Sequence, residues 1–239
     1  MRDSTNYIVK FVLIMTVIVA FVLAGMQTVL KPIHDKNEAV YNKRSVLLAV
    51  NPVLDKPVDQ LTDDEVQEIF ENKINAFVIN SAGETVDGKL AESIKLKDEL
   101  AKPAADQEYP MYIYTNGGKK YYIMSIRGQG LWDAIWANVA VEDDLTTIVS
   151  ASFDHQGETP GLGAEIKDNP AFPKQFQGKK IYDEAGNYQS VSVIKGVIKE
   201  PDHEVDGISG ATVTCNGVSD MLYDGIKNYE PYLQSLGKN

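Results

Sequence analysis

Hydrophobic and polar positions divide the chain into an apolar beginning and a long mixed remainder. Residues 11–30 (FVLIMTVIVAFVLAGMQTVL) contain no charged side chain. A helix of about 20 residues, with a rise of ~1.5 Å per residue, matches the ~30 Å hydrocarbon core of a bilayer. The pattern therefore predicts a transmembrane helix over residues 11–30, after a short N-terminal segment (residues 1–10) and before a stalk helix or linker (residues 31–55).

A cleaved signal peptide is the alternative explanation of the apolar run. Arg2 and Lys10 give the basic start of such a peptide, and residues 22–24 (VLA) resemble its cleavage site. The run is longer than the ~7–15 residues of a typical signal-peptide core, which favours a retained span. Further basic residues follow the run: Lys31, Lys36, Lys43 and Arg44. They oppose export of the C-terminal part, but long C-terminal domains are translocated largely regardless of loop charge, so the orientation stays open.

The remainder, residues 56–239, predicts one compact α+β domain with an antiparallel sheet and flanking helices. A capping box of Thr62 and Glu65 indicates the start of a helix. Residues 110–127 predict a β-hairpin whose turn is formed by residues 116–118 (NGG). Further strands are expected over residues 76–84, 134–141, 147–153 and 191–198, and helices over residues 34–50, 169–177 and 214–229. The sequence has no internal repeat or long linker that would require a second domain.

Composition narrows the classes of function. A hydrophobic content of 44% is that of a protein with a packed core. With 34 acidic and 23 basic residues, the formal net charge is -11, which repels a phosphate backbone and excludes nucleic acid as a partner. The single cysteine, Cys215, excludes an internal disulfide and an iron–sulfur cluster held by cysteines of this chain alone.

One loop of small residues precedes the last predicted helix. It comprises residues 206–212 (DGISGAT) and leads directly into that helix. Backbone N–H groups at a helix start are unpaired and carry positive partial charge, so they favour an anionic phosphate. An ordinary turn that caps the helix through Ser209 or Thr212 is the alternative. A threonine hydroxyl is a poor nucleophile without help, so these residues alone do not predict a covalent cofactor.

The same loop resembles the flavinylation motif of the FMN-binding domain family. The matching residues are Asp206, Ser209, Gly210, Ala211 and Thr212. In that family a separate flavin transferase joins FMN to the final threonine as a phosphoester. The resemblance therefore implies that Thr212 carries FMN covalently and that Asp206 serves the transferase. Thr214 lies two residues further on, so the sequence alone leaves modification at that position open.

A second motif strengthens the resemblance. Residues 157–163 (GETPGLG) and 128–132 (GQGLW) are similar to segments of the C subunits of the Na⁺-translocating NADH:quinone oxidoreductases and of the G subunits of the related Rnf complexes. Pro160 and Leu162 would form a rigid apolar wall for a flavin ring, with Gly161 and Gly163 permitting close approach. Glu158 and Thr159 would place polar groups near the ring edge. Trp132 is expected either to stack on the ring or to pack in the core, and Trp136 to lie in the core.

The resemblance implies an electron-carrying subunit of a sodium-pumping NADH:quinone oxidoreductase. Such a subunit would take electrons from an iron–sulfur centre of its membrane partners and pass them to a second flavin subunit. The sequence has no G-x-G-x-x-G segment for NADH, so NADH oxidation would belong to the complex. The resemblance also places the span in the bacterial inner membrane, residues 1–10 in the cytoplasm and the FMN domain on the outer, periplasmic face. The G subunit of an Rnf complex and a non-redox anchored binding module are the alternatives.

Three other sets of residues are candidates for different chemistry. His155 with Glu158, and His203 with Asp202 and Glu204, resemble parts of metal sites, but neither set has a further ligand at a suitable spacing. We expect these to be loop residues. Cys215 is expected to be a small apolar residue in the first turn of the last helix.

Overall fold

The computed structural model describes residues 2–237, and the chain divides into two compact units between Asn42 and Lys43. The first unit is formed by most of helix α1 (Arg2–Leu48), which continues through Pro32. Among the described residues, α1 is the one helix long and apolar enough to span a bilayer, and its most apolar stretch is unburied. The predicted apolar helix is therefore present, and it continues without a break into the predicted stalk (residues 31–55) as far as Leu48, where α1 ends.

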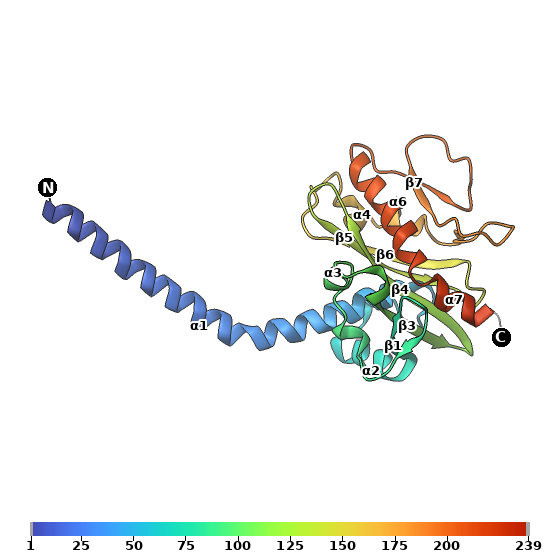
Figure 1. The fold of residues 1–239 in the computed structure, drawn as a ribbon, viewed down its shortest axis with the longest axis horizontal. Helices are drawn as coiled ribbons and strands as arrows, with labels where there is room; N and C mark the ends of the chain where they lie inside the picture. The colour runs from blue at the N-terminus through green and yellow to red at the C-terminus, as the bar shows by residue number, and fades with distance from the viewer. Residues whose placement is uncertain (1, 238–239) are drawn as a thin grey trace. The chain divides into compact units, whose positions relative to one another are not determined.

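The second unit contains an antiparallel sheet whose strand order is β2-β1-β3-β4-β5-β6 (Figure 1). The strands are β1 (Ile74–Asn80), β2 (Thr85–Val86), β3 (Glu108–Asn116), β4 (Lys119–Gln129), β5 (Ala134–Val141) and β6 (Ile148–His155). The helices are α2 (Asp63–Lys73), α3 (Leu96–Glu99), α4 (Glu165–Asp168), α5 (Ala171–Lys174), α6 (Thr212–Lys227) and α7 (Glu230–Gly237), with short 3-10 helices at Asn51–Val53, Val58–Gln60, Ala91–Ser93 and Ala104–Asp106. This is the predicted α+β fold.

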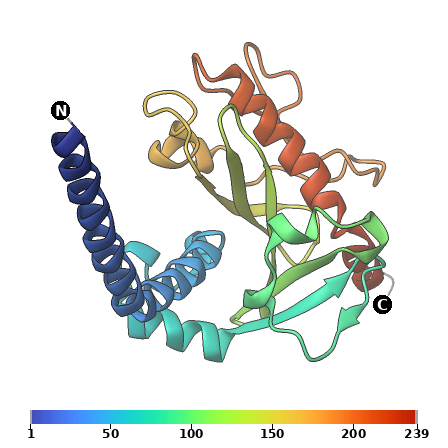
Figure 2. The ribbon, with the colours of Figure 1, turned by 60° about the vertical axis from the view of Figure 1, so that its left-hand side comes forward.

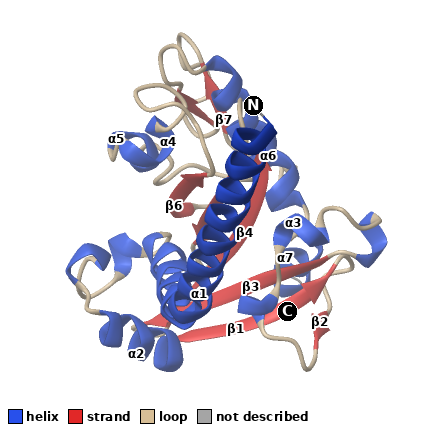
Figure 3. Cartoon of the chain, turned by 90° about the vertical axis from the view of Figure 1, so that its left-hand side faces the viewer, coloured by secondary structure: helices blue, strands red, loops and turns tan. Residues whose placement is uncertain are grey.

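The hairpin of β3 and β4 forms as the sequence predicts. Its turn pairs Asn116 with Lys119, and both central residues have positive φ, at 59° for Gly117 and 82° for Gly118. Glycine adopts this conformation at little cost, and it is the turn that matches the twist of paired strands. The hairpin therefore supplies two adjacent strands of the sheet, β3 and β4, as Figure 3 shows.

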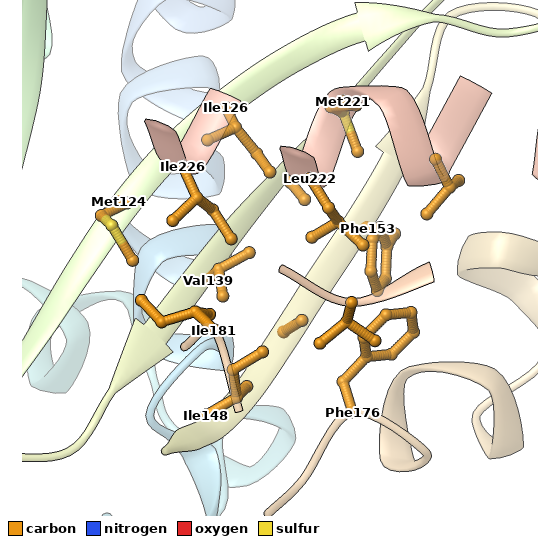
Figure 4. Close-up of a cluster of buried hydrophobic side chains, with 14 of the residues drawn as sticks. Met124, Ile126, Val139, Ile148, Phe153, Phe176, Ile181, Met221, Leu222 and Ile226 are labelled. Atoms are coloured by element: carbon orange, nitrogen blue, oxygen red, sulfur yellow. The ribbon is translucent and has the colours of Figure 1, made fainter. Parts of the chain in front are cut away.

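Both faces of the sheet are buried. On one face, Met124, Ile126 and Val139 pack with Met221, Leu222 and Ile226 of α6 (Figure 4). On the other face, Tyr112, Tyr114 and Ile123 pack with Val66 and Phe70 of α2 and with the end of α1. Residues along β3 alternate between these two clusters, which explains why the strands carry apolar side chains at successive positions instead of at every second one.

The C-terminal helix α6 lies across the sheet and contacts β4 closely (Figure 2). Its predicted apolar stripe of Val218, Met221, Leu222 and Ile226 is buried. The helix starts at Thr212, two residues before the predicted start. A side chain at Gly217 would place its Cβ 2.2 Å from the carbonyl oxygen of Gln129, so only glycine permits this approach.

Several predicted elements differ in extent. Strand β1 begins at Ile74, immediately after α2, and ends at Asn80, and the rest of residues 76–84 forms a turn. The predicted helix over residues 169–177 is reduced to the single turn α5, because Pro170 and Pro173 remove backbone donors. The predicted strand over residues 191–198 is only β7 (Ser192–Ile194), which pairs in parallel with β8 (Glu204–Asp206), a strand that the sequence did not predict.

Candidate functional site

The site is built around the first turn of α6. Thr212 is its first residue and is exposed, as is Val213. The first intrahelical hydrogen bond is donated by the N–H of Cys215 to the carbonyl of Ala211, at 2.9 Å. The N–H groups before Cys215 thus have no intrahelical acceptor, no side chain caps the helix at Ala211, and the first turn contains no acidic residue. This helix start combines free donors with positive partial charge and has no negative charge in its first turn to offset them.

The loop before α6 brings two of the sequence motifs into contact. Gly210 has a φ of +81°, and a Cβ at this position would lie 2.8 Å from Cδ2 of Leu162. Gly210 is therefore required both for the backbone conformation and for the approach of the 157–163 loop. Leu162 ends a short turn in this second loop, in which its N–H donates to the carbonyl of Thr159 at 3.1 Å. The two loops thus meet within a few residues of Thr212.

Glu158 belongs to the 157–163 loop and is buried, with 4% of the residue exposed. Its Oε2 accepts a hydrogen bond from the hydroxyl of Thr214 at 2.6 Å, and its Oε1 accepts one from the backbone N–H of Trp132 at 2.9 Å. From the sequence we expected this carboxylate near the edge of a flavin ring. In the structure both oxygens accept from groups of the protein, and the position of the carboxylate relative to a flavin ring stays a prediction.

The surroundings of Glu158 determine its charge. Burial raises the pKa of its carboxyl group. Hydrogen bonds from the Thr214 hydroxyl and from the backbone N–H groups of Trp132 and Asp133 lower the pKa by more than burial raises it, so the net pKa is below the ordinary value.

Two glycines leave room for the carboxylate of Glu158. A Cβ at Gly163 would lie 2.2 Å from Oε2, and a Cβ at Gly130 would lie 2.5 Å from Oε1. These motif glycines therefore accommodate an ionised carboxylate.

Apolar side chains remain exposed around the same helix start. Leu131, Trp132, Leu162 and Val213 are 49%, 69%, 40% and 53% exposed. We call these four residues the apolar rim. The indole Nε1 of Trp132 donates to the hydroxyl of Thr159 at 3.1 Å, which ties the ring to the 157–163 loop. Trp132 therefore does not belong to the core, and a group of large exposed apolar side chains is typical of a binding surface.

The remaining predicted site residues are distributed between surface and interior. Asp206, Ser209, Thr159, Pro160 and Gly161 are exposed, whereas Ala211 and Gly163 are buried. Trp136, which was expected in the core, is only half-buried, and the guanidinium of Arg127 lies 5.7 Å from its ring centre.

Two of the other candidates lie in strands and not in loops as expected: His155 is the last residue of β6, and Glu204 is the first residue of β8. His155 Nδ1 accepts a hydrogen bond from the N–H of Glu158, and His203 Nδ1 pairs with the carbonyl of Ser190. Cys215 is buried, and burial raises the pKa of its thiol. Within residues 2–237, the one group of three or more possible metal ligands consists of His34, Asp35 and Glu38, which are exposed on α1.

Thr214 has a structural role that the sequence did not reveal. Its side chain is buried, with 1% exposed, and its hydroxyl is the partner of Glu158. The available signal was its place in the helix: residues two apart differ in direction by about 200°, so an exposed Thr212 implies an inward-facing Thr214.

Comparisons with known proteins identify the family. The model of the FMN-binding domain family matches residues 130–227. This range contains the 157–163 and 206–212 loops and residues 130–132 of the 128–132 segment. The C subunit of the Na⁺-translocating NADH-quinone reductase of Neisseria meningitidis serogroup A is 33% identical over 98% of this chain and 95% of that protein. The chain belongs to the family of these C subunits, the NqrC family. Another member, from Pseudomonas aeruginosa, is 28% identical over 99% of this chain and 98% of its own length.

Solved structures of the NqrC family share the fold. The crystal structure of the family member from Parabacteroides distasonis has a TM-score of 0.74 and 34% identity, covering 85% of this chain and 96% of that one. NqrC of Shewanella oneidensis has a TM-score of 0.71 and 25% identity, covering 85% of this chain and 98% of that one. Residues 130–227 thus form an FMN-binding domain in a chain that also carries the long apolar helix.

Proposed function

We propose that this chain is an electron-relay subunit of a Na⁺-translocating NADH:quinone reductase, and that its FMN is bound through a phosphoester to Thr212. The observation that carries the proposal is the exposed hydroxyl-bearing residue at the uncapped start of α6. It lies in the segment that resembles the flavinylation motif and beside the apolar rim.

The helix start fits the phosphate of such a cofactor. A phosphodiester keeps one negative charge, and the free N–H groups of the first turn of α6 would donate to its oxygens. The macrodipole of α6 favours the same charge, and none of the residues of the first turn is acidic. The carboxylate of Glu158, which contacts this turn, is hydrogen-bonded to the hydroxyl of Thr214. This electrostatic fit would hold the phosphate, while the covalent bond would prevent its dissociation.

The apolar rim fits a planar aromatic ring. Leu162 and Val213 offer apolar surface beside Thr212, and the hydrogen bond from Trp132 to Thr159 holds the indole at the same end of the domain. When bound, FMN supplies one- and two-electron chemistry. The chain's own residues would hold the ring, exclude water from one face and set its potential through nearby charge.

Burial supports Thr212 over its neighbour as the attachment residue. The hydroxyl of Thr214 is buried and donates to Glu158, so a transferase cannot reach it in the folded domain. Asp206 is exposed six residues before Thr212, where it is accessible to the transferase as the resemblance implies.

The wider assembly is also part of the proposal. The anchor is α1, whose apolar stretch suits a bacterial inner membrane, with the FMN domain on the periplasmic face. The partners are the other membrane subunits, including an iron–sulfur donor and a second flavin subunit, together with a flavin transferase for maturation. The relatives that support this assignment belong to Na⁺-translocating NADH-quinone reductases, which favours the sodium pump over an Rnf complex.

Intact-mass measurement tests the attachment. The full chain would be produced together with a flavin transferase, as wild type and as Thr212→Ala. Thr115→Ala, at an exposed threonine of β3 outside the motifs, is the matched hydroxyl control. We expect one FMN adduct on the wild type and the control and none on Thr212→Ala. Flavin fluorescence on a denaturing gel should follow the same pattern. An adduct that persists on Thr212→Ala would refute the proposed attachment.

A further inference from the structure

We infer that Glu158 is a positioning residue whose buried carboxylate fixes the Thr212 hydroxyl and the Trp132 indole relative to each other, so that both face the flavin. This inference rests on the proposed attachment of FMN to Thr212. It assigns Glu158 a role in placing the cofactor without contact between its carboxylate and the flavin ring.

The carboxylate joins segments that are far apart in the chain. One oxygen binds Thr214 in α6, which is 56 residues away, and the other binds the backbone of Trp132, which is 26 residues away. The backbone N–H of Glu158 donates to Nδ1 of His155, the last residue of β6, at 3.2 Å. This bond connects Glu158 to the end of that strand. Glu158 therefore connects its own 157–163 loop with the 128–132 segment and with the first turn of α6.

The contact with Thr214 determines where Thr212 points. Successive helical residues turn by about 100°, so side chains two positions apart point about 200° apart. Because Glu158 holds Thr214 inward, Thr212 must face outward at the start of the same turn. Without this hydrogen bond, the first turn of α6 would be held by its backbone bonds and by the N–H of Ile208, which donates to Cys215 Sγ at 3.3 Å.

The contact with Trp132 determines where the indole lies. Glu158 accepts from the backbone N–H of Trp132, and the next residue, Thr159, accepts from the indole Nε1. Both ends of the tryptophan are thus tied to adjacent residues of one loop. The same loop carries Leu162, which lies against Gly210, so two members of the apolar rim, Trp132 and Leu162, are held by one loop.

The pocket is shaped for a carboxylate, because Gly130 and Gly163 both lack the Cβ atoms that would collide with its oxygens. A buried ionised group is costly unless it is well hydrogen-bonded, and here both oxygens have donors. Because both oxygens already accept from protein donors, we assign the carboxylate no role as a base towards the exposed Thr212 hydroxyl. Its effect on cofactor attachment must therefore be exerted through Thr214 and Trp132.

The test uses the full chain produced with a flavin transferase and compares matched variants. Thr214→Val replaces the hydroxyl with a methyl group of similar size and removes only the donor to Glu158, whereas Thr214→Ser keeps it. Glu158→Ala removes the carboxylate, and Glu158→Gln keeps an acceptor for Trp132 and a polar partner for Thr214. Glu184→Gln, at an exposed turn, controls for loss of a negative charge. Circular dichroism selects the variants that fold.

The readouts are the rate of FMN addition by intact mass and the fluorescence anisotropy of the attached flavin. We expect Thr214→Val and Glu158→Ala to lower the rate by roughly tenfold or more, because small misplacement of a reacting group is costly. Their flavin should also show lower anisotropy. The rate of FMN addition should stay within about twofold of wild type in Thr214→Ser, Glu158→Gln and Glu184→Gln. Thr214→Ser loses a methyl group but keeps the hydroxyl, so a normal rate in this variant would show that the hydrogen bond matters and not the packing.

The inference fails if folded Thr214→Val adds FMN at the wild-type rate with unchanged anisotropy, and this variant decides the matter if Glu158→Ala does not fold. It also fails if Thr214→Ser is as slow as Thr214→Val. A wild type that acquires no adduct, or acquires it elsewhere than Thr212, would instead refute the proposed function.

Discussion

Replacing Gly217 with alanine should destabilise the domain, although alanine favours helices. The new Cβ would lie 2.2 Å from the carbonyl oxygen and 3.2 Å from the carbonyl carbon of Gln129. Both atoms belong to the backbone of β4, so the clash cannot be relieved by rotating a side chain. Either α6 or the end of β4 must move.

The magnitude follows from two opposing effects. Overpacking of a tight contact costs typically 1–3 kcal/mol, and a backbone clash at this distance belongs at the upper end, about 3 kcal/mol. The higher helix propensity of alanine stabilises the folded state by about 1 kcal/mol relative to glycine. We therefore expect a net loss of about 2 kcal/mol, which corresponds to roughly 4–8 °C in Tm for a domain of this size.

Thermal unfolding of the full chain in detergent, followed by circular dichroism, measures this loss. Gly237→Ala is the matched control, because a Cβ at the end of α7 meets nothing within 4 Å. Its Tm should stay within about 2 °C of wild type, as expected for surface substitutions. A Gly217→Ala protein with an unchanged or higher Tm would show that α6 is not held against Gln129 as described.

Two further predictions concern the surroundings of Thr212. The pKa of Glu158 is lowered in the folded state, so its ionised form stabilises the fold above the unfolded pKa of about 4.3, and this stabilisation is lost as the pH falls through the folded-state value. Wild type should therefore lose more stability than Glu158→Gln in denaturant titrations between about pH 6 and pH 3, and equal losses would contradict the assigned hydrogen bonds. Trp132→Ala should change the free energy of unfolding by no more than about 0.5 kcal/mol because the side chain is exposed, but it should brighten the fluorescence of attached flavin by removing a stacking quencher. Unchanged flavin fluorescence would place the indole away from the ring.

The local signals in the sequence were sufficient for most of the fold. Both hydrogen bonds of the capping box at Thr62 and Glu65 are present, and α2 begins where they predict. The glycine turn at residues 116–118 specified its hairpin because only two residues set the geometry. The apolar stripe of α6 likewise follows from helical periodicity alone. Each of these signals depends on neighbours within a few positions.

The features that the sequence did not predict depend on contacts between distant segments. Strand β8 forms only because β7 offers a parallel partner, and its three residues carry little pattern of their own. The orientation of Glu158 depends on hydrogen bonds from Trp132 and Thr214, which are distant in the sequence. The glycine-rich sequence around Glu158 is typical of an exposed loop and therefore could not reveal that this residue is buried. The family resemblance indicated segments that the structure brings together, but not which of their groups face inward.

The position of α6 near the end of the chain links the integrity of the core to the presence of the attachment site. The sheet residues Met124, Ile126 and Val139 are covered by α6, the same helix that begins with Thr212 (Figure 4). A chain that is cut or terminated before α6 would expose the hydrophobic face of the sheet and would also lack Thr212. Truncated copies should therefore be recognised as misfolded and degraded, so that few folded subunits without a cofactor site compete for places in the complex.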